Sequence, residues 1–336
     1  MNEVIQHGNK TVYPIVMPTD YNGMDSINCY IYQHGEDLTL IDAGIDTPKF
    51  EQFFWDKLAE YGLDAARINR IVLTHFHADH IGMVNTLVEK YGMPVYASDI
   101  AIPRLKCEED YLRQKLDFYY ELYAQYNVTK FASERMARLE ATLTNKERVM
   151  LHTDLLTICD GEQIAGLDVL AAPGHSPDSV CLYDSETNWL FAGDFLLASG
   201  VTNALVDHDD AGQLMNPTIQ YIDSIQNMQK IPISTVFAGH GELFSNATEV
   251  MENSVKKTEY KLQKVVAKIA DGHETATSLG EAIYGPRFAK FFVFTISDVI
   301  GLTLLAEQRG LITREWLNDE WHFSKMLKVR KFKIIY

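Results

Sequence analysis

Over the first hundred residues, short runs of apolar and β-branched residues alternate with segments in which apolar residues have helical spacing. Residues 28–33 and 37–42 are β-rich and are joined by a polar turn, which is typical of a hairpin. Apolar side chains at three- and four-residue steps predict a helix over residues 48–61. The same patterns predict a strand over residues 69–74, a helix over 81–91 and a strand over 94–97. This alternation predicts an α/β fold built on a buried sheet.

The segment over residues 101–150 departs from the alternation. Leucine and tyrosine residues recur at helical steps from Leu105 to Tyr123, and no strand pattern interrupts them. We therefore expect an inserted helical segment. Short strands return afterwards, over residues 155–158, 163–164, 167–172, 180–184, 189–192 and 234–238.

From about residue 245 the pattern changes again. Helices are expected over residues 248–270, 276–284 and 287–309, the first of them amphipathic and rich in lysine. Residues 311–323 then alternate around Asn318-Asp319, a pair typical of a hairpin turn. Helices followed by a hairpin are the element order of a winged helix.

The length of 336 residues suits two domains or one large one. We expect a first domain over residues 1–245, with the segment over 101–150 as an insertion or cap. A small winged-helix-like domain is expected over residues 246–336.

Four side chains of metal-binding type lie within six residues, directly after the strand over 69–74. They are His75, His77, Asp79 and His80. Alternate side chains of an extended stretch share a face, so His75 and His77 are expected to point the same way. Imidazole and carboxylate together suit zinc, and also iron or manganese.

Three further residues of ligand type follow later strands, and each comes directly after a glycine. They are His175, Asp194 and His240. Open α/β sheets place their sites at the carboxyl ends of strands, and glycine lets backbone approach a site without a Cβ clash. A single H-x-H motif would be weak evidence, but seven such residues at strand ends predict a metal centre.

The combined pattern of H-x-H-x-D-H, G-H-S, G-D and G-H-G resembles the metallo-β-lactamase-fold hydrolases over roughly residues 10–245. The resemblance implies an αββα sandwich with two metal ions at one edge. It implies that His75, His77 and His175 hold the first ion, that Asp79, His80 and His240 hold the second, and that Asp194 bridges both. Asp42 matches an early aspartate of the family and is expected to hydrogen-bond a ligand imidazole.

A hydrolytic mechanism follows from this metal set. Two divalent ions, zinc first with iron and manganese as alternatives, would hold a bridging hydroxide near neutral pH and polarise a carbonyl or phosphoryl oxygen. Asp79 and Asp194 would take part by offsetting some of the metal charge. The leaving-group acid is not evident. His208, in an acidic stretch after Asp194, is one candidate, and a solvated loop is the alternative for that stretch.

The inserted helices supply candidates for substrate contacts. Their segment begins near the sheet edge that carries the ligands and is rich in tyrosine. Pockets are lined largely by apolar and aromatic side chains with a few polar groups, so Tyr119, Tyr120 and Tyr123 are candidate walls of a cap. The alternative is that these aromatics join two helices or form a homodimer contact.

Charge narrows the choice of function. The chain carries 30 Lys and Arg against 46 Asp and Glu, a net charge of −16. Residues 250–336 hold 14 basic and 10 acidic residues, which leaves 16 and 36 for residues 1–249. An acidic surface repels phosphate backbones, so we expect a hydrolase of small-molecule esters, thioesters, lactones or phosphoesters. The alternatives are a metal-dependent endoribonuclease that holds RNA with its basic tail, and a non-enzymatic metal-binding or winged-helix regulator.

Two positions separate the chain from particular branches of the resembled superfamily. Leu197 stands where the quorum-signal lactonases carry tyrosine. His77 stands where flavo-diiron proteins carry glutamate. These departures favour hydrolysis over redox chemistry and weaken the lactonase interpretation.

A cytoplasmic location is expected. There is no run of about 18 apolar residues to span a membrane, and the N-terminal residues lack the pattern of a signal peptide. The four cysteines, Cys29, Cys107, Cys159 and Cys181, are far apart in the chain. We expect them to be buried free thiols in a reducing compartment.

Overall fold

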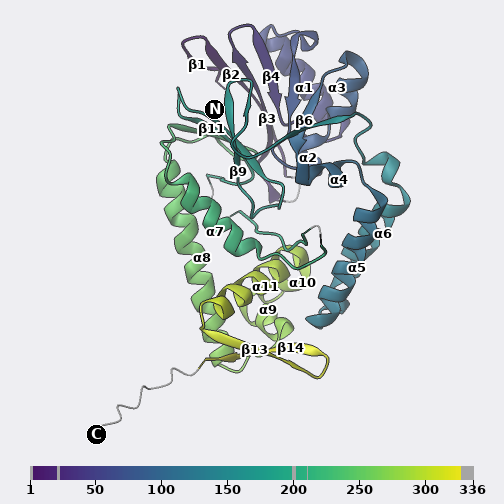
Figure 1. Ribbon diagram of the computed structural model, residues 1–336, viewed down its shortest axis with the longest axis vertical. Coiled ribbons are helices and arrows are strands. Elements are labelled where there is room, and N and C mark those ends of the chain that lie inside the picture. The colour runs from purple at the N-terminus through teal and green to yellow at the C-terminus, as the bar shows by residue number, and fades with distance from the viewer. Residues whose placement is uncertain (1–2, 21–22, 199–201, 210, 327–336) are drawn as a thin grey trace.

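The computed structural model describes residues 3–20, 23–198, 202–209 and 211–326. Two β-sheets pack face to face in the upper half of Figure 1, and helices cover both of their outer faces. The larger sheet has the strand order β1-β2-β3-β4-β5-β6-β7, and the smaller has the order β12-β11-β10-β9-β8. The expected αββα sandwich is confirmed.

The strands follow the sequence prediction closely, apart from two at the start of the chain. The larger sheet comprises β1 (Ile5–His7), β2 (Lys10–Pro18), β3 (Ser26–His34), β4 (Asp37–Ile41), β5 (Arg70–Val72), β6 (Val95–Ser98) and β7 (Leu155–Ile158). The smaller comprises β8 (Gln163–Ile164), β9 (Leu167–Ala171), β10 (Val180–Asp184), β11 (Trp189–Gly193) and β12 (Thr235–Ala238). The sequence analysis did not predict β1 and β2, which extend the larger sheet beyond β3.

The helices of the sandwich connect the strands or follow them. They are α1 (Pro48–Tyr61), α2 (Ala78–Ile81), α3 (Val84–Tyr91), α7 (Pro217–Met228) and α8 (Ala247–Ala270), with the 3₁₀ helices η2 (Ala65–Arg67) and η3 (Asp99–Ala101). The helix expected over residues 81–91 is divided between α2 and α3. Gly82 lies at the break, and a Cβ there would be 2.0 Å from the backbone nitrogen of Asp46.

Hydrophobic layers on both faces of each sheet hold the sandwich together. α1 and α3 cover the larger sheet, and α7 and the first turns of α8 cover the smaller one. On α1, Phe50, Phe54 and Leu58 recur at four-residue steps, and all three are buried against the sheet. Between the sheets, Tyr32 packs edge to face on Phe191, with ring centroids 5.6 Å apart. Because both faces of each sheet are covered by apolar side chains, a solvent-accessible polar site is expected at the ends of the strands.

A buried ion pair joins the two sheets. Nζ of Lys10 on β2 lies 2.8 Å from Oδ1 of Asp184 on β10, and the two side chains are only 3% and 1% exposed. The hydroxyl of Tyr32 on β3 donates to Oδ2 of Asp184 at 2.9 Å. Burial acts to raise the pKa of Asp184, but the hydrogen bonds from Lys10 and Tyr32 outweigh it and hold that pKa below its usual value.

A second set of polar contacts joins β3 to the end of β12. The backbone N–H of Asn28 donates to the carbonyl of Gly239 at 3.0 Å. The side-chain amide of Asn28 and the hydroxyl of Tyr30 both donate to the carbonyl of Ala238, at 2.8 and 2.6 Å. This group, called the β3–β12 seam below, fixes the backbone directly before His240.

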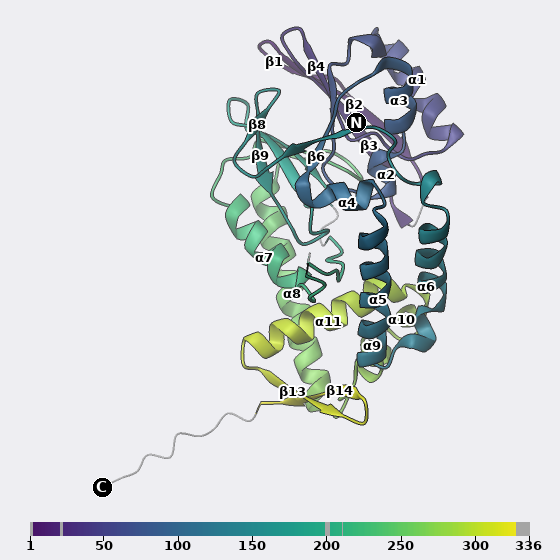
Figure 2. The same ribbon diagram turned by 45° about the vertical axis from the view of Figure 1, so that its right-hand side comes forward.

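Residues 101–150 are helical, as expected. They form α4 (Ile102–Leu105), α5 (Glu109–Gln125), α6 (Thr129–Thr144) and the 3₁₀ helix η4 (Lys146–Arg148). α5 and α6 lie side by side and pack against the C-terminal helices (Figure 2). Tyr123 lies against Phe292 with ring centroids 5.3 Å apart, and Phe131 lies against Phe288 at 5.0 Å. The insertion and the C-terminal helices therefore share one hydrophobic core.

The C-terminal region has the expected order of helices and then a hairpin. After α8 come α9 (Ala276–Tyr284), α10 (Arg287–Lys290), α11 (Phe292–Gln308), β13 (Ile312–Leu317) and β14 (Glu320–Lys325). Asn318 and Asp319 turn the hairpin with φ of 52° and 63°. The helix expected over 287–309 is divided at Phe291. The winged-helix assignment and the boundary at residue 245 stay predictions, and residues 327–336 lie outside the described residues.

The cysteines are free thiols. Cys29, Cys107 and Cys181 are buried as expected, whereas Cys159 is exposed because it lies in the turn that follows β7. No helix within the described ranges has the length and apolar character needed to cross a membrane.

Candidate metal centre

The strand ends that carry the predicted ligands meet at one edge of the sandwich. β4 and β5 are parallel neighbours, so Asp42 and the loop with His75 and His77 leave the larger sheet together. β9 and β11 are both antiparallel to β10, and β11 is parallel to β12, so His175, Asp194 and His240 leave the smaller sheet at the same edge. Their ligand atoms form three groups whose members lie within 4.8 Å of one another: His75, His77 and His175; His75, His80 and Asp194; and Asp79, His80 and His240.

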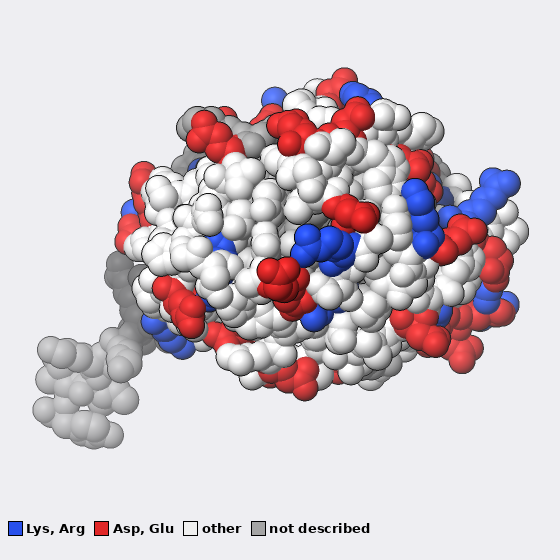
Figure 3. Space-filling model, turned by 90° about the horizontal axis from the view of Figure 1, so that it is seen from above, with Lys and Arg blue, Asp and Glu red and all other residues white. Residues whose placement is uncertain are grey.

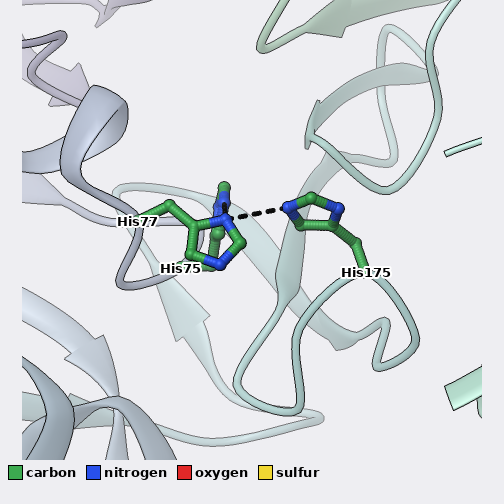
Figure 4. A group of neighbouring side chains, drawn as sticks. All are labelled: His75, His77 and His175. Carbon is green, nitrogen blue, oxygen red and sulfur yellow. Dashed lines mark hydrogen bonds between the residues drawn. The ribbon is translucent and has the colours of Figure 1, made fainter. Parts of the chain in front are cut away.

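Three imidazoles converge in the first group. Nε2 of His75 lies 3.0 Å from Nδ1 of His77, and Nε2 of His175 lies 2.9 Å from the same atom (Figure 4). His75 comes from the loop after β5 and His175 from the loop after β9, so the group bridges the two sheets.

Asp194 lies between the His75–His77–His175 group and the Asp79–His80–His240 group. Its Oδ2 is 3.5 Å from Nε2 of His175 and 3.1 Å from Nε2 of His240, and its Oδ1 is 3.3 Å from Nε2 of His80. Nε2 of His240 is also 3.4 Å from Oδ2 of Asp79. The Asp194 carboxylate thus faces the His75–His77–His175 group and the Asp79–His80–His240 group.

In three of the buried imidazoles, the ring nitrogen that points away from the site, Nδ1, donates a hydrogen bond to an oxygen atom. Nδ1 of His80 bonds Oδ2 of Asp42 at 2.8 Å, Nδ1 of His240 bonds the carbonyl of Ser26 at 2.7 Å, and Nδ1 of His175 bonds the carbonyl of Asn203 at 3.1 Å. Carbonyl and carboxylate oxygens have no proton to give, so Nδ1 is the donor in each pair. A neutral ring of this tautomer presents the lone pair of Nε2 to the centre of the site.

His75 reaches the same state through a relay. The hydroxyl of Thr74 donates to Oδ2 of Asp42 at 2.8 Å, so its oxygen accepts from Nδ1 of His75 at 3.0 Å. Nε2 of His75 then carries a lone pair, as Nε2 of His175 does. Nδ1 of His77 faces both lone pairs and has at most one proton to offer. A cation satisfies all three nitrogens at once.

Burial and neighbouring charge divide the imidazoles by pKa. Burial, with neighbouring imidazoles, lowers the pKa of His75 and His175 and brings that of His77 to about 3. For His240, burial is outweighed by Asp194 and Asp79, which raise its pKa to about 9, and Asp42 and Asp194 raise that of His80. A metal ion would take the place of the protons on these two rings.

Three buried polar atoms without hydrogen-bond partners among the described residues, and the close packing around Gly239, are also consistent with a bound metal ion. Nε2 of His80, Nε2 of His240 and Oδ1 of Asp194 are buried without hydrogen-bond geometry to any described atom. A Cβ on Gly239 would lie 2.4 Å from Oδ1 of Asp194 and 2.7 Å from Cε1 of His80. The donor set of imidazoles and carboxylates suits zinc, iron or manganese.

A cavity of about 190 Å³ opens beside the first group and includes His77 and His175 in its wall. Tyr119 of α5 lines this cavity, and its hydroxyl donates to the carbonyl of Val206 at 2.7 Å. Of the four residues expected to contact substrate, only Tyr119 lies in the described wall.

The other three lie elsewhere. Tyr123 is buried between α5 and the C-terminal helices. Tyr120 is 45% exposed and bonds Glu140 in a groove between α5 and α6. His208 is buried against the rings of Tyr111 and Phe118, so it is not on a solvated loop.

The sequence analysis missed two charged residues of this cavity wall, Lys115 and Arg135. Lys115 lies one helical turn before Tyr119, so the same spacing that singled out the tyrosine would have found it. The carbonyls of Ser26 and Asn203 were also missed, and they have no side-chain signal to find.

A model of the metallo-beta-lactamase superfamily matches residues 22–240, and the chain belongs to that superfamily. It is therefore a metal-dependent hydrolase whose substrate the superfamily does not define. Probable metallo-hydrolase YqjP of Bacillus subtilis (strain 168) is 25% identical over 321 residues, which cover 94% of this chain and 98% of that protein.

Two more similarities extend this assignment. An atrochrysone carboxyl ACP thioesterase of Aspergillus fumigatus is 22% identical over 82% of this chain and 75% of that protein. The crystal structure of a metallo-beta-lactamase family protein from Thermus thermophilus has a TM-score of 0.74 at 22% identity, covering 94% of this chain and 98% of that one. The second similarity shows that the fold, including the insertion and the C-terminal helices, recurs.

Proposed function

We propose that the chain binds two divalent metal ions, zinc first, and hydrolyses a small-molecule acyl substrate, with thioesters as the leading class. The position of Asp194 carries the proposal. Its two oxygens face His80, His175 and His240, so one carboxylate serves both ligand groups. Two ions held there supply a water nucleophile near neutral pH and polarise the substrate oxygen.

The chain's own residues prepare the site for this chemistry. Asp42 orients His80 directly and His75 through the hydroxyl of Thr74. Asp79 and Asp194 bring negative charge that offsets part of the metal charge, and neighbouring groups hold the pKa of both carboxyls low. Burial in a water-poor edge strengthens each of these interactions.

Thioesters are favoured over other acyl substrates because of one relative. The Aspergillus fumigatus protein named as a thioesterase aligns over 82% of this chain. The cavity beside His77 and His175 is also of a size for a small acyl group.

A nuclease is less well supported, because the described part of the C-terminal region, residues 250–326, carries as many acidic as basic residues. Lysines of α8 pair with carboxylates: Lys256 with Glu252, Lys261 with Asp298 and Lys268 with Asp271, at 3.2, 2.5 and 3.6 Å. Figure 3 shows the opposite end of the molecule, above the sandwich, where lysine and arginine are interspersed with aspartate and glutamate. A salt titration of RNA binding separates the two functions, since phosphate contacts give a steep salt dependence.

The test combines metal analysis with a substrate panel. Protein purified without chelator and reconstituted with zinc or manganese is expected to hold about two ions per chain, given the first and third ligand groups with Asp194 between them. It is assayed on acyl thioesters, lactones and p-nitrophenyl phosphodiesters. Asp194→Ala and His77→Ala should abolish turnover while the fold is kept, because both residues lie on loops at strand ends.

The exposed His152 gives the matched control, His152→Ala, which should keep both metal content and turnover. One ion or none after reconstitution would contradict the binuclear proposal. Ordinary turnover in Asp194→Ala would place the chemistry elsewhere.

A further inference from the structure

The cavity beside His77 and His175 has a positively charged wall. Lys115 of α5 and Arg135 of α6 both line it, and both come from the inserted helices. Asp207 is the one carboxylate among the described residues of that wall. Two cations therefore face one anion across a space of about 190 Å³.

Asp207 is shared among several cationic groups, since burial acts to raise its pKa while Lys115 and Arg104 both lower it. Its Oδ2 lies 3.6 Å from Nη2 of the buried Arg104, and its Oδ1 accepts from the backbone N–H of His208 at 2.9 Å. Within the described ranges, neither Lys115 nor Arg135 forms an ion pair with a carboxylate. The wall therefore keeps an excess of positive charge.

Aromatic rings hold the two cations in place without neutralising them. Nζ of Lys115 donates to the hydroxyl of Tyr111 at 2.9 Å and lies 4.9 Å from the ring centroid of Phe76. The guanidinium of Arg135 lies 4.2 Å from the ring centroid of Tyr119, and its Nε is buried without a hydrogen-bond partner among the described residues. Burial lowers the pKa of Lys115 and outweighs the opposing attraction of Asp207.

We infer that this cavity holds an anionic group of the substrate, a carboxylate or a phosphate, between Lys115 and Arg135 while the scissile bond faces His77 and His175. The inference rests on the proposed function in one respect, that the bound anion belongs to a molecule hydrolysed at the metal centre. Guanidinium and ammonium donors form charge-assisted hydrogen bonds with both anions. The inserted helices thereby select substrates by charge.

Arg135 can be reached from a second side. Together with Leu139 it also lines a groove of about 360 Å³ between α6 and the start of α11, whose wall includes Phe131, Phe292 and Phe294. A substrate longer than the cavity could extend past Arg135 into this apolar groove.

Three thioesters test the inference in the metal-loaded enzyme. Acetyl-N-acetylcysteamine is neutral, succinyl-N-acetylcysteamine has a carboxylate on the acyl side, and acetyl-4′-phosphopantetheine has a phosphate on the thiol side. Lys115→Met and Arg135→Met should lower kcat/KM for the preferred anionic thioester about tenfold more than for the neutral one, mainly through KM. Arg135→Lys should restore part of the preference, and the exposed Arg113 gives the control Arg113→Met, which should leave it intact. Equal losses on all three thioesters would overturn the inference.

A binding measurement separates this inference from the proposed function. The melting temperature of the holoenzyme is followed with sulfate against chloride at equal ionic strength. Sulfate should stabilise the wild type and Arg113→Met more than Lys115→Met/Arg135→Met, because a ligand stabilises the state that binds it. If no thioester is hydrolysed but this difference is found, the proposed function fails and the anion site stands. If thioesters are hydrolysed without charge preference and sulfate acts equally on all variants, the anion site fails alone.

Discussion

Asp42 links the two halves of the metal centre through three hydrogen bonds. Its Oδ1 accepts from the backbone N–H of Thr74, and its Oδ2 accepts from the Thr74 hydroxyl and from Nδ1 of His80, each at 2.8 Å. It occupies a left-handed backbone conformation with φ of 57°, which a short polar side chain tolerates better than most. One carboxylate thus sets the tautomers of His80 and, through Thr74, of His75.

Asp42→Asn is expected to weaken zinc binding about 10- to 100-fold, as loss of a carboxylate behind a ligand imidazole usually does. The amide keeps the left-handed conformation but replaces one accepting oxygen with a donor beside Nδ1 of His80. Competition with a chromogenic chelator measures the affinity. The exposed Asp46 provides the control Asp46→Asn. A zinc affinity within about twofold of wild type would show that Asp42 does not support zinc binding through His80, because that change is smaller than the loss usual for a residue that orients a ligand imidazole.

The sequence could reveal a site residue only where the side chain itself has the functional group that the site uses. His75, His77, Asp79 and His80 lie in one short stretch, and the remaining ligands each follow a strand and a glycine, so side-chain identity alone marked them. The partners of His240 and His175 are backbone carbonyls, which every residue has. The positions of these carbonyls are set by the tertiary structure, so the residue types in the sequence do not predict them.

At the scale of elements, the helical spacing of residues 101–150 was a sound predictor of α5 and α6 but not of the direction in which their faces point. Tyr119 and Tyr123 are one turn apart and share a face, yet the first reaches the cavity and the second packs on Phe292. The C-terminal helices that cover this face lie more than a hundred residues further along the chain. Periodicity reports burial and does not identify the partner.

The tyrosines should accordingly differ when truncated. Tyr123→Ala removes a buried ring from the shared core and is expected to cost about 3–5 kcal/mol of unfolding free energy. Tyr120→Ala changes an exposed side chain and should cost about 0.5 kcal/mol or less. Urea denaturation at constant metal content measures both. A Tyr123→Ala variant of unchanged stability but reduced kcat/KM would instead make this residue a wall of the substrate path.

One divided helix and one unpredicted strand also have physical causes. The helix expected over 81–91 breaks where Gly82 meets the backbone of Ile45 and Asp46, a contact that helical periodicity does not encode. Strand β2 was missed because Pro14 interrupts it, and proline normally argues against a strand. Pro14 is tolerated because β1 pairs only with residues 10–12, which leaves β2 at the sheet edge from Tyr13 onward.

At the scale of the whole molecule, the ion pair of Lys10 and Asp184 ties one sheet to the other. Asp184→Asn leaves the Lys10 ammonium buried beside a neutral amide, and among the described residues the exposed Glu186 is the remaining carboxylate paired with it. Breaking a buried pair in this way is expected to cost about 3–5 kcal/mol near pH 7.

The pH dependence of that loss follows from the lowered pKa of Asp184. Because the pKa is lower in the folded than in the unfolded chain, the carboxylate contributes its full stability above pH of about 4 and loses it as the pH falls through the folded value. The gap in unfolding free energy between wild type and Asp184→Asn should therefore be constant near neutrality and narrow progressively below about pH 4. Urea titrations across this range measure it, with the exposed Asp154→Asn as the control. A gap that widened towards acid would exclude an ionised Asp184 as its source.

The β3–β12 seam has a consequence for motion. The Asn28 amide hydrogen is held by Gly239 across the two sheets, so it can exchange with solvent only when the sheets part. The residues that would hold metal ions, His240 and the loop of His75 to His80, lie beyond the seam, and none of them takes part in this contact. Exchange at Asn28 then follows global opening of the sandwich, while exchange in the ligand loop follows local fluctuations that a bound ion would suppress. One edge of the protein thereby places an amide that is expected to report global opening beside a loop whose amides are expected to report metal binding.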